Sequence, residues 1–460
     1  MSRLVIVSNR VPMPGERGAR AGGLAVALAD ALQPGALWFG WSGKRAAGTS
    51  TEAVIHHHEG IDYATIDLSE SDYRRFYVGF SNGALWPLLH FRTGLLNFQR
   101  DEYEGYLEVN RAFAKALQPL LRPDDVIWIH DYQLLTMAAA LRALGVTQKI
   151  GFFLHIPFVP PAILHVLPPA DDLVGAMCSA DVVGFQTEGD RGAFVDACAT
   201  CLNAPPDEQG LVHYRGRTTK PVVTPIGIDS REFARVAARA VRGAETRRLR
   251  ESLVGRALVI GADRLDYTKG LPNRFDAFAR LLELYPEHLR QVSLLQIAAR
   301  SREDVDRYQS LRRELDRKAG DINGRFSDFD WVPLRYMTRA VGRTTLAGFF
   351  RMAHIGLVTP LRDGMNLVAK EFIAAQNEDD PGVLILSRFA GAADELSEAL
   401  IVNPYDADAV ASAMHQALVM KIEERRERHL ASLAKIRQTT ASSFCADFLG
   451  YLNPKISKAA

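Results

Sequence analysis

One pattern recurs along the chain: a short apolar run rich in Val and Ile, followed by a longer amphipathic stretch. The runs lack polar alternation, which is typical of strands buried on both faces of a parallel sheet covered by helices. Among the stretches between them, 274–285 places Phe275, Phe278 and Leu281 on one helical face. The alternation predicts doubly wound α/β domains with parallel sheets. The apolar runs are Leu4–Val7, Val126–Ile129, Ile150–Leu154, Val182–Phe185, Val222–Val223, Ala257–Ile260, Val292–Ile297, Ile355–Val358 and Val383–Leu386.

The length of 460 residues suits two domains better than one core. A polar, Arg-rich stretch over 231–256 follows the segment Pro225–Asp229, and a new strand begins at Ala257. We therefore expect a Rossmann-like N-terminal domain over 1–228 and a second Rossmann-like domain over 229–435. The remaining residues, 436–460, have weak helical periodicity and are predicted to form a C-terminal helical arm.

The charge balance argues against polyanionic partners, because 55 Lys and Arg residues nearly cancel 54 Asp and Glu residues. From this balance we expect no nucleic acid as a partner. We also expect no membrane as a partner, since no apolar run approaches the roughly 20 residues of a membrane span. The N-terminus also lacks a secretory apolar region, and we expect a cytoplasmic protein. Cys198 and Cys201 form a C-x-x-C pair without further paired ligands, so we interpret them as packing residues and predict no metal site.

Polar clusters follow several of the predicted strands. In open parallel α/β sheets, ligands bind at the carboxyl ends of the strands. Five clusters lie there, and we expect them to form the binding site. They are Asn9–Arg10, His130–Tyr132, His155, Arg264 and Asp363–Gly364.

The segment 359–371 is the most informative of these. A strand end, a glycine turn at Gly364 and the start of a helix form an anion site, because backbone N–H groups and the helix dipole favour a diphosphate there. Asp363 suits sugar hydroxyls, and Glu371 suits a ribose diol. The alternative is an ordinary strand–helix loop with surface acids.

A second cationic turn lies over 264–270. Arg264 and Lys269 bracket it and suit a leaving diphosphate, whose negative charge grows in the transition state. A surface salt-bridge pair is the alternative. Near the N-terminus, Arg10 and the pair Gly22–Gly23 indicate close backbone approach to a phosphate or sugar. The dinucleotide fingerprint G-x-G-x-x-G is missing there, which argues against a nicotinamide enzyme.

His155, which precedes Ile156-Pro157-Phe158, suits a sugar contact, with His130 and Asp131 at a second strand end. No nucleophile elbow supports a hydrolase. Aromatic residues around Trp41, Tyr77 and Trp86 suit either a sugar-stacking platform or core packing, and the sequence leaves both open.

Together these segments resemble the trehalose-6-phosphate synthases over about residues 1–435, with the motifs in the family's order. The resemblance rests on 8–10, 127–132, 155–158, 264–270 and 363–371. It implies a retaining, nucleotide-sugar-dependent glycosyltransferase of GT-B architecture, with two Rossmann-like domains facing a cleft. The N-terminal domain would bind the acceptor glucose 6-phosphate and the C-terminal domain the donor, which we expect to be UDP-glucose. No cofactor and no metal are implied, and we expect a homo-oligomer.

The resemblance also assigns roles to residues. The acceptor phosphate would contact Arg10, Tyr77 and Arg302, and the glucose pocket would be lined by Trp41, Trp86, Asp131 and Tyr132. The catalytic group would comprise His155, Arg264, Lys269 and Asp363. Donor contacts would come from Gly22, Gly23, Arg264, Lys269, Asp363, Gly364, Met365, Asn366, Leu367, Val368 and Glu371.

Retention normally suggests a carboxylate nucleophile and a covalent intermediate. The resemblance instead implies reaction on one face, in which the departing phosphate oxygen takes the acceptor proton. The segment 339–341 does not identify the donor base. A sister enzyme with another acceptor, such as a glucosylglycerol-phosphate synthase, and a catalytically silent regulatory subunit are the alternatives. The acceptor residues Arg10, Trp41, Tyr77, Trp86 and Asp131 discriminate between acceptors.

Overall fold

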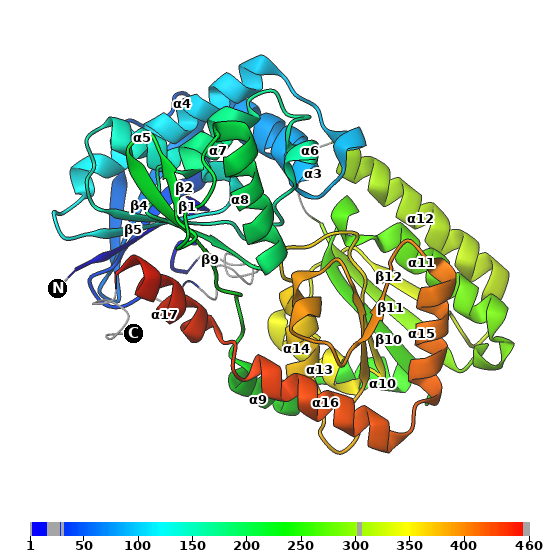
Figure 1. Ribbon diagram of the computed structural model, residues 1–460. Coiled ribbons are helices and arrows are strands. Elements are labelled where there is room, and N and C mark those ends of the chain that lie inside the picture. Colours follow the sequence, from blue (N-terminus) through cyan, green and yellow to red (C-terminus); the bar gives the residue numbers. More distant parts are fainter. Residues whose placement is uncertain (1, 16–27, 29–31, 301–305, 454–460) are drawn as a thin grey trace. The chain divides into compact units, whose positions relative to one another are not determined.

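The computed structural model describes residues 2–15, 28, 32–300 and 306–453, and it divides into two compact units. The first unit comprises Met1–Ile226 with Ala441–Ala460, and the second comprises Gly227–Thr440 (Figure 1). The chain therefore passes from one unit to the other twice, after Ile226 and after Thr440. Among the described residues, no helix is both long and apolar enough to cross a membrane.

The first unit is built on a sheet whose strand order is β3-β4-β2-β1-β5-β6-β7-β9-β8. The inner pairs are parallel, whereas β3 and β8 pair antiparallel with their neighbours. The strands are β1 (Leu4–Arg10), β2 (Leu37–Ala46), β3 (Val54–His58), β4 (Ile61–Ser69), β5 (Val126–His130), β6 (Lys149–Phe153), β7 (Val182–Phe185), β8 (Val212–Tyr214) and β9 (Arg217–Val223).

Helices cover this sheet, and one of them is unusual because Tyr73–Leu85 (η1) is π-helical. The Trp86 N–H donates to the Ser81 carbonyl, five residues back, as π geometry requires. The described helices are α2 (Glu70–Asp72), α3 (Trp86–Leu89), α4 (Arg100–Leu117), α5 (Met137–Ala143), α6 (Pro161–Leu164), α7 (Ala170–Met177), α8 (Glu188–Leu202) and α17 (Ala441–Leu452), with 3₁₀ turns η2 (Thr93–Leu95), η3 (Gln118–Leu120) and η4 (Tyr132–Leu134).

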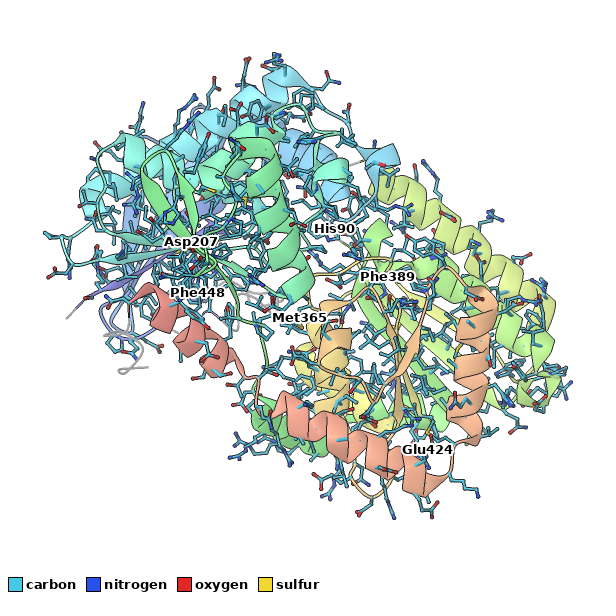
Figure 2. All side chains as sticks on the ribbon, viewed as in Figure 1. His90, Asp207, Met365, Phe389, Glu424 and Phe448 are labelled. Atoms are coloured by element: carbon cyan, nitrogen blue, oxygen red, sulfur yellow. The ribbon has the colours of Figure 1, made fainter. Side chains whose placement is uncertain are left out.

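The C-terminal helix α17 belongs to the first unit although it follows the second in sequence (Figure 2). The Phe448 ring stacks on Trp128 with centroids 4.9 Å apart. Gly151 on β6 and Gly184 on β7 leave room for Phe448, since a Cβ at either position would lie 2.6 Å from its ring atoms. The segment expected as a C-terminal arm thus contributes a helix that packs into a notch made by two glycines.

The second unit contains a parallel sheet of order β12-β11-β10-β13-β14-β15. Its strands are β10 (Ala257–Arg264), β11 (Val292–Ala299), β12 (Leu334–Met337), β13 (Ile355–Val358), β14 (Val383–Ser387) and β15 (Leu400–Val402). Its helices are α9 (Ser230–Ala240), α10 (Ala244–Leu253), α11 (Leu271–Leu284), α12 (Asp306–Phe326), α13 (Arg343–Met352), α14 (Leu367–Ala375), α15 (Ala407–Val419) and α16 (Ile422–Ile436), with turns η5 (Tyr267–Lys269), η6 (Pro286–His288) and η7 (Gly391–Asp394).

The core of the second unit forms where α11 and α15 bury their apolar faces against the sheet. Phe275, Phe278 and Leu281 on α11 are fully buried, which confirms the predicted helical face. Each of the nine apolar runs falls on a strand, although Leu154 lies one residue beyond the end of β6. The α/β class with parallel sheets is confirmed in both units.

Candidate functional site

Lys269 and Asp363, both predicted as site residues, are in direct contact in the second unit. The Lys269 Nζ lies 2.5 Å from Asp363 Oδ2, and the Asn366 amide donates to the same oxygen at 2.9 Å. Both members of the ion pair are largely buried, with 11 % and 15 % of their side chains exposed. A cation, a carboxylate and an amide from two loops therefore meet at the carboxyl edge of this sheet.

Main-chain bonds fix the two loops that carry this pair. The Leu361 N–H donates to the Thr268 carbonyl at 2.8 Å, and the Asp363 N–H donates to the Phe389 carbonyl at 3.0 Å. Gly270 adopts φ +65°, and a Cβ there would lie 2.7 Å from the Thr359 carbonyl oxygen. The loop after β10 thus packs directly against the loop after β13, so that Lys269 reaches Asp363.

The N-terminus of α14 lies immediately beyond Asp363. Asn366, with φ +81°, is the N-cap, and its side chain accepts from the Ala369 N–H at 3.3 Å. The first N–H groups of a helix have no intrahelical acceptor, and with the helix dipole they favour an anion. The segment from Gly364 to Val368 therefore has the strand–turn–helix geometry that the sequence predicts for a diphosphate site.

Glu371 lies one turn into α14. Burial raises the pKa of its carboxyl to about 7, while Arg343, whose Nε lies 4.0 Å from Oε1, acts in the opposite direction. Arg264 is the last residue of β10 and is exposed at the same sheet edge. The structure thus places Arg264 and Glu371 on elements that flank the Lys269–Asp363 pair.

In the first unit, Arg10, Trp41 and Tyr77 come together at the ends of β1 and β2. Arg10 pairs with Trp41 in the β1–β2 register, after a bulge. The Arg10 guanidinium lies against Gly43, where a Cβ would be 2.8 Å from Nε. Tyr73 stacks on Tyr77 and makes a tilted contact with Trp41, with centroids 5.4 Å from each, and the Trp41 and Tyr77 rings lie 6.4 Å apart. A guanidinium beside aromatic rings suits a phosphorylated sugar.

Trp86 and Tyr132 form a second, buried aromatic pair, with ring centroids 5.3 Å apart. The Tyr132 hydroxyl donates to Asn82 Oδ1 at 2.8 Å, and the Asn82 amide donates to the Tyr77 carbonyl at 2.7 Å. The π-helical segment therefore connects the two aromatic groups. Asn82 was not predicted as a site residue. It lies in the π-helical segment, and no local sequence pattern distinguishes a π-helix from an α-helix.

Asp131 has an uncommon backbone conformation for a residue other than glycine, with φ +76° and ψ 168°. Such strain is frequent at functional sites. Asp131 Oδ1 accepts from the His155 N–H at 3.3 Å, and the Asp131 N–H donates to the Phe153 carbonyl at 2.8 Å. The ends of β5 and β6 are thereby joined, and the Asp131 carboxylate is held beside His155.

The hydrogen-bond network around His155 assigns its tautomer. The Ile226 N–H donates to Gln186 Oε1 at 2.9 Å, so the amide nitrogen of Gln186 faces His155 Nδ1, at 3.4 Å. Nδ1 is then the acceptor, and Nε2–H donates to His130 Nδ1 at 3.0 Å. Gln186 was not predicted as a site residue, although it directly follows β7 and so lies at the carboxyl end of a strand, where ligands bind in such sheets.

Both rings of this histidine pair are neutral at physiological pH. Burial lowers the pKa of His155 to about 3, and burial together with His155 holds the pKa of His130 well below its usual range. His155 therefore acts as a neutral, oriented ring.

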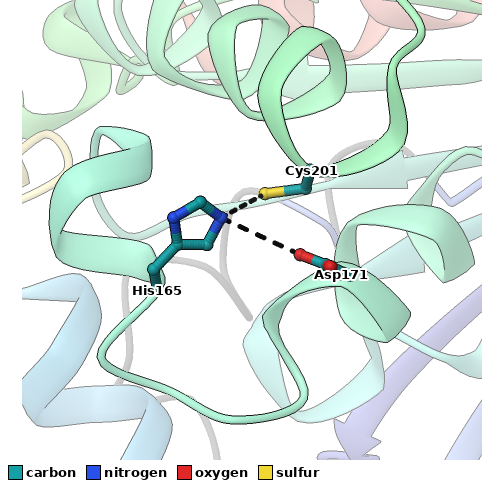
Figure 3. Close-up of side chains that lie close together, drawn as sticks. All are labelled: His165, Asp171 and Cys201. Carbon is teal, nitrogen blue, oxygen red and sulfur yellow. Dashed lines mark hydrogen bonds and ion pairs between the residues drawn. The ribbon is translucent and has the colours of Figure 1, made fainter.

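Three predicted site residues, Gly22, Gly23 and Arg302, lie outside the described residues. The two cysteines of the C-x-x-C spacing have different partners. Cys198 Sγ lies 3.7 Å from Cys178 Sγ, whereas Cys201 Sγ lies 3.2 Å from His165 Nε2, beside Asp171 (Figure 3). The spacing therefore does not form a paired thiol site.

Comparison with known proteins gives consistent matches over the full chain. The model of glycosyltransferase family 20 matches residues 2–454. A trehalose-6-phosphate synthase of Sinorhizobium fredii is 47 % identical over 460 residues, covering 98 % of each chain. Among solved structures, a UDP-forming α,α-trehalose-phosphate synthase from Burkholderia vietnamiensis has a TM-score of 0.96 and 47 % identity, covering 100 % of this chain and 98 % of that one. The corresponding Burkholderia xenovorans enzyme in complex with glucose 6-phosphate has a TM-score of 0.95 and 47 % identity, covering 98 % of this chain and 100 % of that one.

Proposed function

The chain belongs to glycosyltransferase family 20, and from this membership we propose that it transfers glucose from UDP-glucose to glucose 6-phosphate, giving α,α-trehalose 6-phosphate. Its two α/β units are those of the GT-B fold. The observation that carries the proposal is the contact of Lys269 with Asp363 beside the N-terminus of α14.

The second unit would hold the donor. The α14 N-terminus and the Lys269 ammonium meet the diphosphate, and the Asp363 carboxylate accepts from hydroxyls of the glucosyl group. Arg264 adds a second cation at the same edge. Charge on the leaving diphosphate grows as the glycosidic bond breaks, so these cations stabilise the transition state more than the ground state.

The first unit would hold the acceptor. Arg10, at the end of β1, suits the phosphate of glucose 6-phosphate because its planar guanidinium can bind two phosphate oxygens. Tyr77 contacts Trp41, the register partner of Arg10. Trp41, Trp86 and Asp131 provide the ring faces and the carboxylate that suit a sugar.

The chemistry proceeds with retention and without a covalent enzyme intermediate. The bond between the anomeric carbon and the phosphate oxygen breaks, and the acceptor hydroxyl oxygen bonds to that carbon from the same face. The acceptor proton passes to the departing phosphate oxygen. Two features support this route: His155 is neutral with a pKa too low for a general base, and the Asp363 carboxylate already accepts from Lys269 and Asn366 through Oδ2.

Turnover with UDP-, ADP- and GDP-glucose tests the proposal, together with the variant Lys269→Met. The matched control is Lys318→Met, which removes a Lys–Asp pair of the same unit, to Asp276, that lies on α11 and α12 rather than in the loops. We expect UDP-glucose to be the preferred donor and kcat to fall at least about a hundredfold in the Lys269 variant alone. Equal activity of the two variants would contradict the role of Lys269.

A further inference from the structure

Arg274 is a fully buried cation in the second unit, with 1 % of the residue exposed. It lies on the first turn of α11, which begins immediately after the loop that carries Lys269. Placing an unpaired guanidinium in a protein interior is costly, so a buried arginine is retained only where several acceptors surround it. Its partners show what it does.

The guanidinium joins the carboxyl ends of three adjacent strands. Its Nη1 donates to Asp263 Oδ2 on β10 at 2.5 Å and to Gln296 Oε1 on β11 at 2.8 Å. Its Nε donates to Thr359 Oγ1, one residue beyond β13, at 3.1 Å. A longer contact of 3.5 Å runs from Nη2 to the Lys269 carbonyl.

The neighbouring backbone leaves space for this arrangement. At Gly261 on β10, a Cβ would lie 2.4 Å from Gln296 Oε1 and 2.6 Å from Arg274 Nη1. Any other residue at this position would displace the guanidinium or its acceptor.

Three of the four partners of Arg274 belong to segments that carry proposed donor-site residues, and the fourth, Gln296, belongs to the neighbouring strand β11. Asp263 precedes Arg264, the Lys269 carbonyl belongs to the cation itself, and Thr359 begins the loop that carries Asp363. One planar group thus fixes the starting points of the three segments that present these side chains.

We propose that Arg274 is a positioning residue of the donor site, which holds Arg264, Lys269 and Asp363 in register through the three strand ends. This inference rests on the proposed function. A displacement of about 1 Å at a reacting centre can cost about a hundredfold in rate, so loss of the Arg274 hydrogen bonds should lower kcat. Apart from Arg302, the proposed acceptor-binding residues belong to the other unit, so KM for glucose 6-phosphate should change less than kcat.

The test is the variant Arg274→Lys, which keeps the positive charge beside Asp263 but cannot donate to Gln296 and Thr359 at once. The matched control is Arg351→Lys. Arg351 on α13 also donates to two acceptors of the same unit, the Ala375 and Gln376 carbonyls at 3.0 Å, which lie at the opposite end of α14. Melting temperature, kcat and both KM values are measured for each variant.

We expect both variants to melt lower than the parent by similar amounts, and kcat to fall at least about tenfold in Arg274→Lys only. A kcat within twofold of the parent in Arg274→Lys, or an equal loss in Arg351→Lys, would overturn the proposal. If Arg274→Lys does not fold, Thr359→Val is the variant to test, because it removes the acceptor of the Arg274 Nε without changing any charge. We expect Thr359→Val to lower kcat by a smaller factor than the roughly tenfold loss expected for Arg274→Lys.

Failure of the proposed function is separable from failure of this inference. If the parent does not turn over UDP-glucose, the proposed function fails. The affinity for UDP, measured by calorimetry, then tests the positioning role of Arg274 independently of turnover. UDP affinity at least about fivefold weaker in Arg274→Lys than in Arg351→Lys supports the positioning role, and a smaller difference overturns it.

Discussion

The titration of Glu371 predicts that donor binding depends on pH. Burial raises the pKa of this carboxyl to about 7. In the role that we propose for Glu371, its ionised carboxylate accepts hydrogen bonds from the ribose diol of UDP-glucose. A raised carboxyl pKa means that the binding-competent form is lost as the pH falls through about 7. Affinity for UDP-glucose should therefore weaken on acidification.

The size of the effect follows from the fraction of ionised carboxylate. With a pKa of about 7, this fraction is about 0.09 at pH 6 and about 0.91 at pH 8, and apparent affinity scales with the fraction of competent protein. The dissociation constant for UDP-glucose should thus be about tenfold larger at pH 6 than at pH 8. UDP-glucose is the suitable ligand, because its diphosphate diester does not titrate in this range, unlike the terminal phosphate of UDP.

Isothermal titration calorimetry with UDP-glucose, without acceptor, measures both constants. The control is Glu371→Gln, which keeps the shape of the side chain but cannot titrate. This variant should bind UDP-glucose more weakly than the parent does at pH 8, and its dissociation constant should be the same at pH 6 and pH 8. The reasoning is refuted if the parent shows equal affinity at pH 6 and pH 8, or if the Gln variant shows the same pH dependence as the parent.

Three further predictions concern packing and protonation. Phe448→Ala should lower the free energy of unfolding by about 3–5 kcal/mol, since it empties the notch over Gly151 and Gly184, and an unchanged urea midpoint would contradict that packing. Gly227→Ala should lower the melting temperature clearly, because the new Cβ would lie 1.9 Å from the Thr439 carbonyl oxygen, and an unaltered melting curve would exclude this contact. His155→Asn should reduce kcat by the same factor at pH 6 and pH 8, because the pKa of about 3 keeps the ring neutral at both; factors differing more than about threefold would indicate a titrating histidine.

The strand-end rule could be applied from the sequence alone, because apolar runs mark buried parallel strands regardless of their neighbours. It placed Arg264 and Asp363 at two strand ends, and the cationic turn 264–270 added Lys269. The contact of Lys269 with Asp363 joins residues 94 apart in sequence and depends on the packing of two loops. Likewise, the sequence placed His155 after β6, whereas its tautomer depends on Gln186 and the Ile226 N–H. The side chain was predictable, and its protonation state was not.

Several elements gave no usable signal. Strand β2 mixes three aromatic residues with glycine and ends in exposed residues, so it lacks the Val- and Ile-rich pattern that marked the nine predicted runs. The π-helical turn over 73–85 has helical periodicity and differs only in its hydrogen bonds. For α17, the sequence showed only weak helical periodicity, and the two glycines that receive Phe448 lie more than 250 residues earlier.

The most direct measurement is NMR of the product formed from UDP-glucose and glucose 6-phosphate by the purified protein. We expect a single disaccharide phosphate whose two glucose units are joined by an α,α-1,1 linkage, with one UDP released for each product molecule. A β-configured linkage would contradict the retaining, same-face mechanism, and UDP release without any disaccharide would contradict transfer to glucose 6-phosphate.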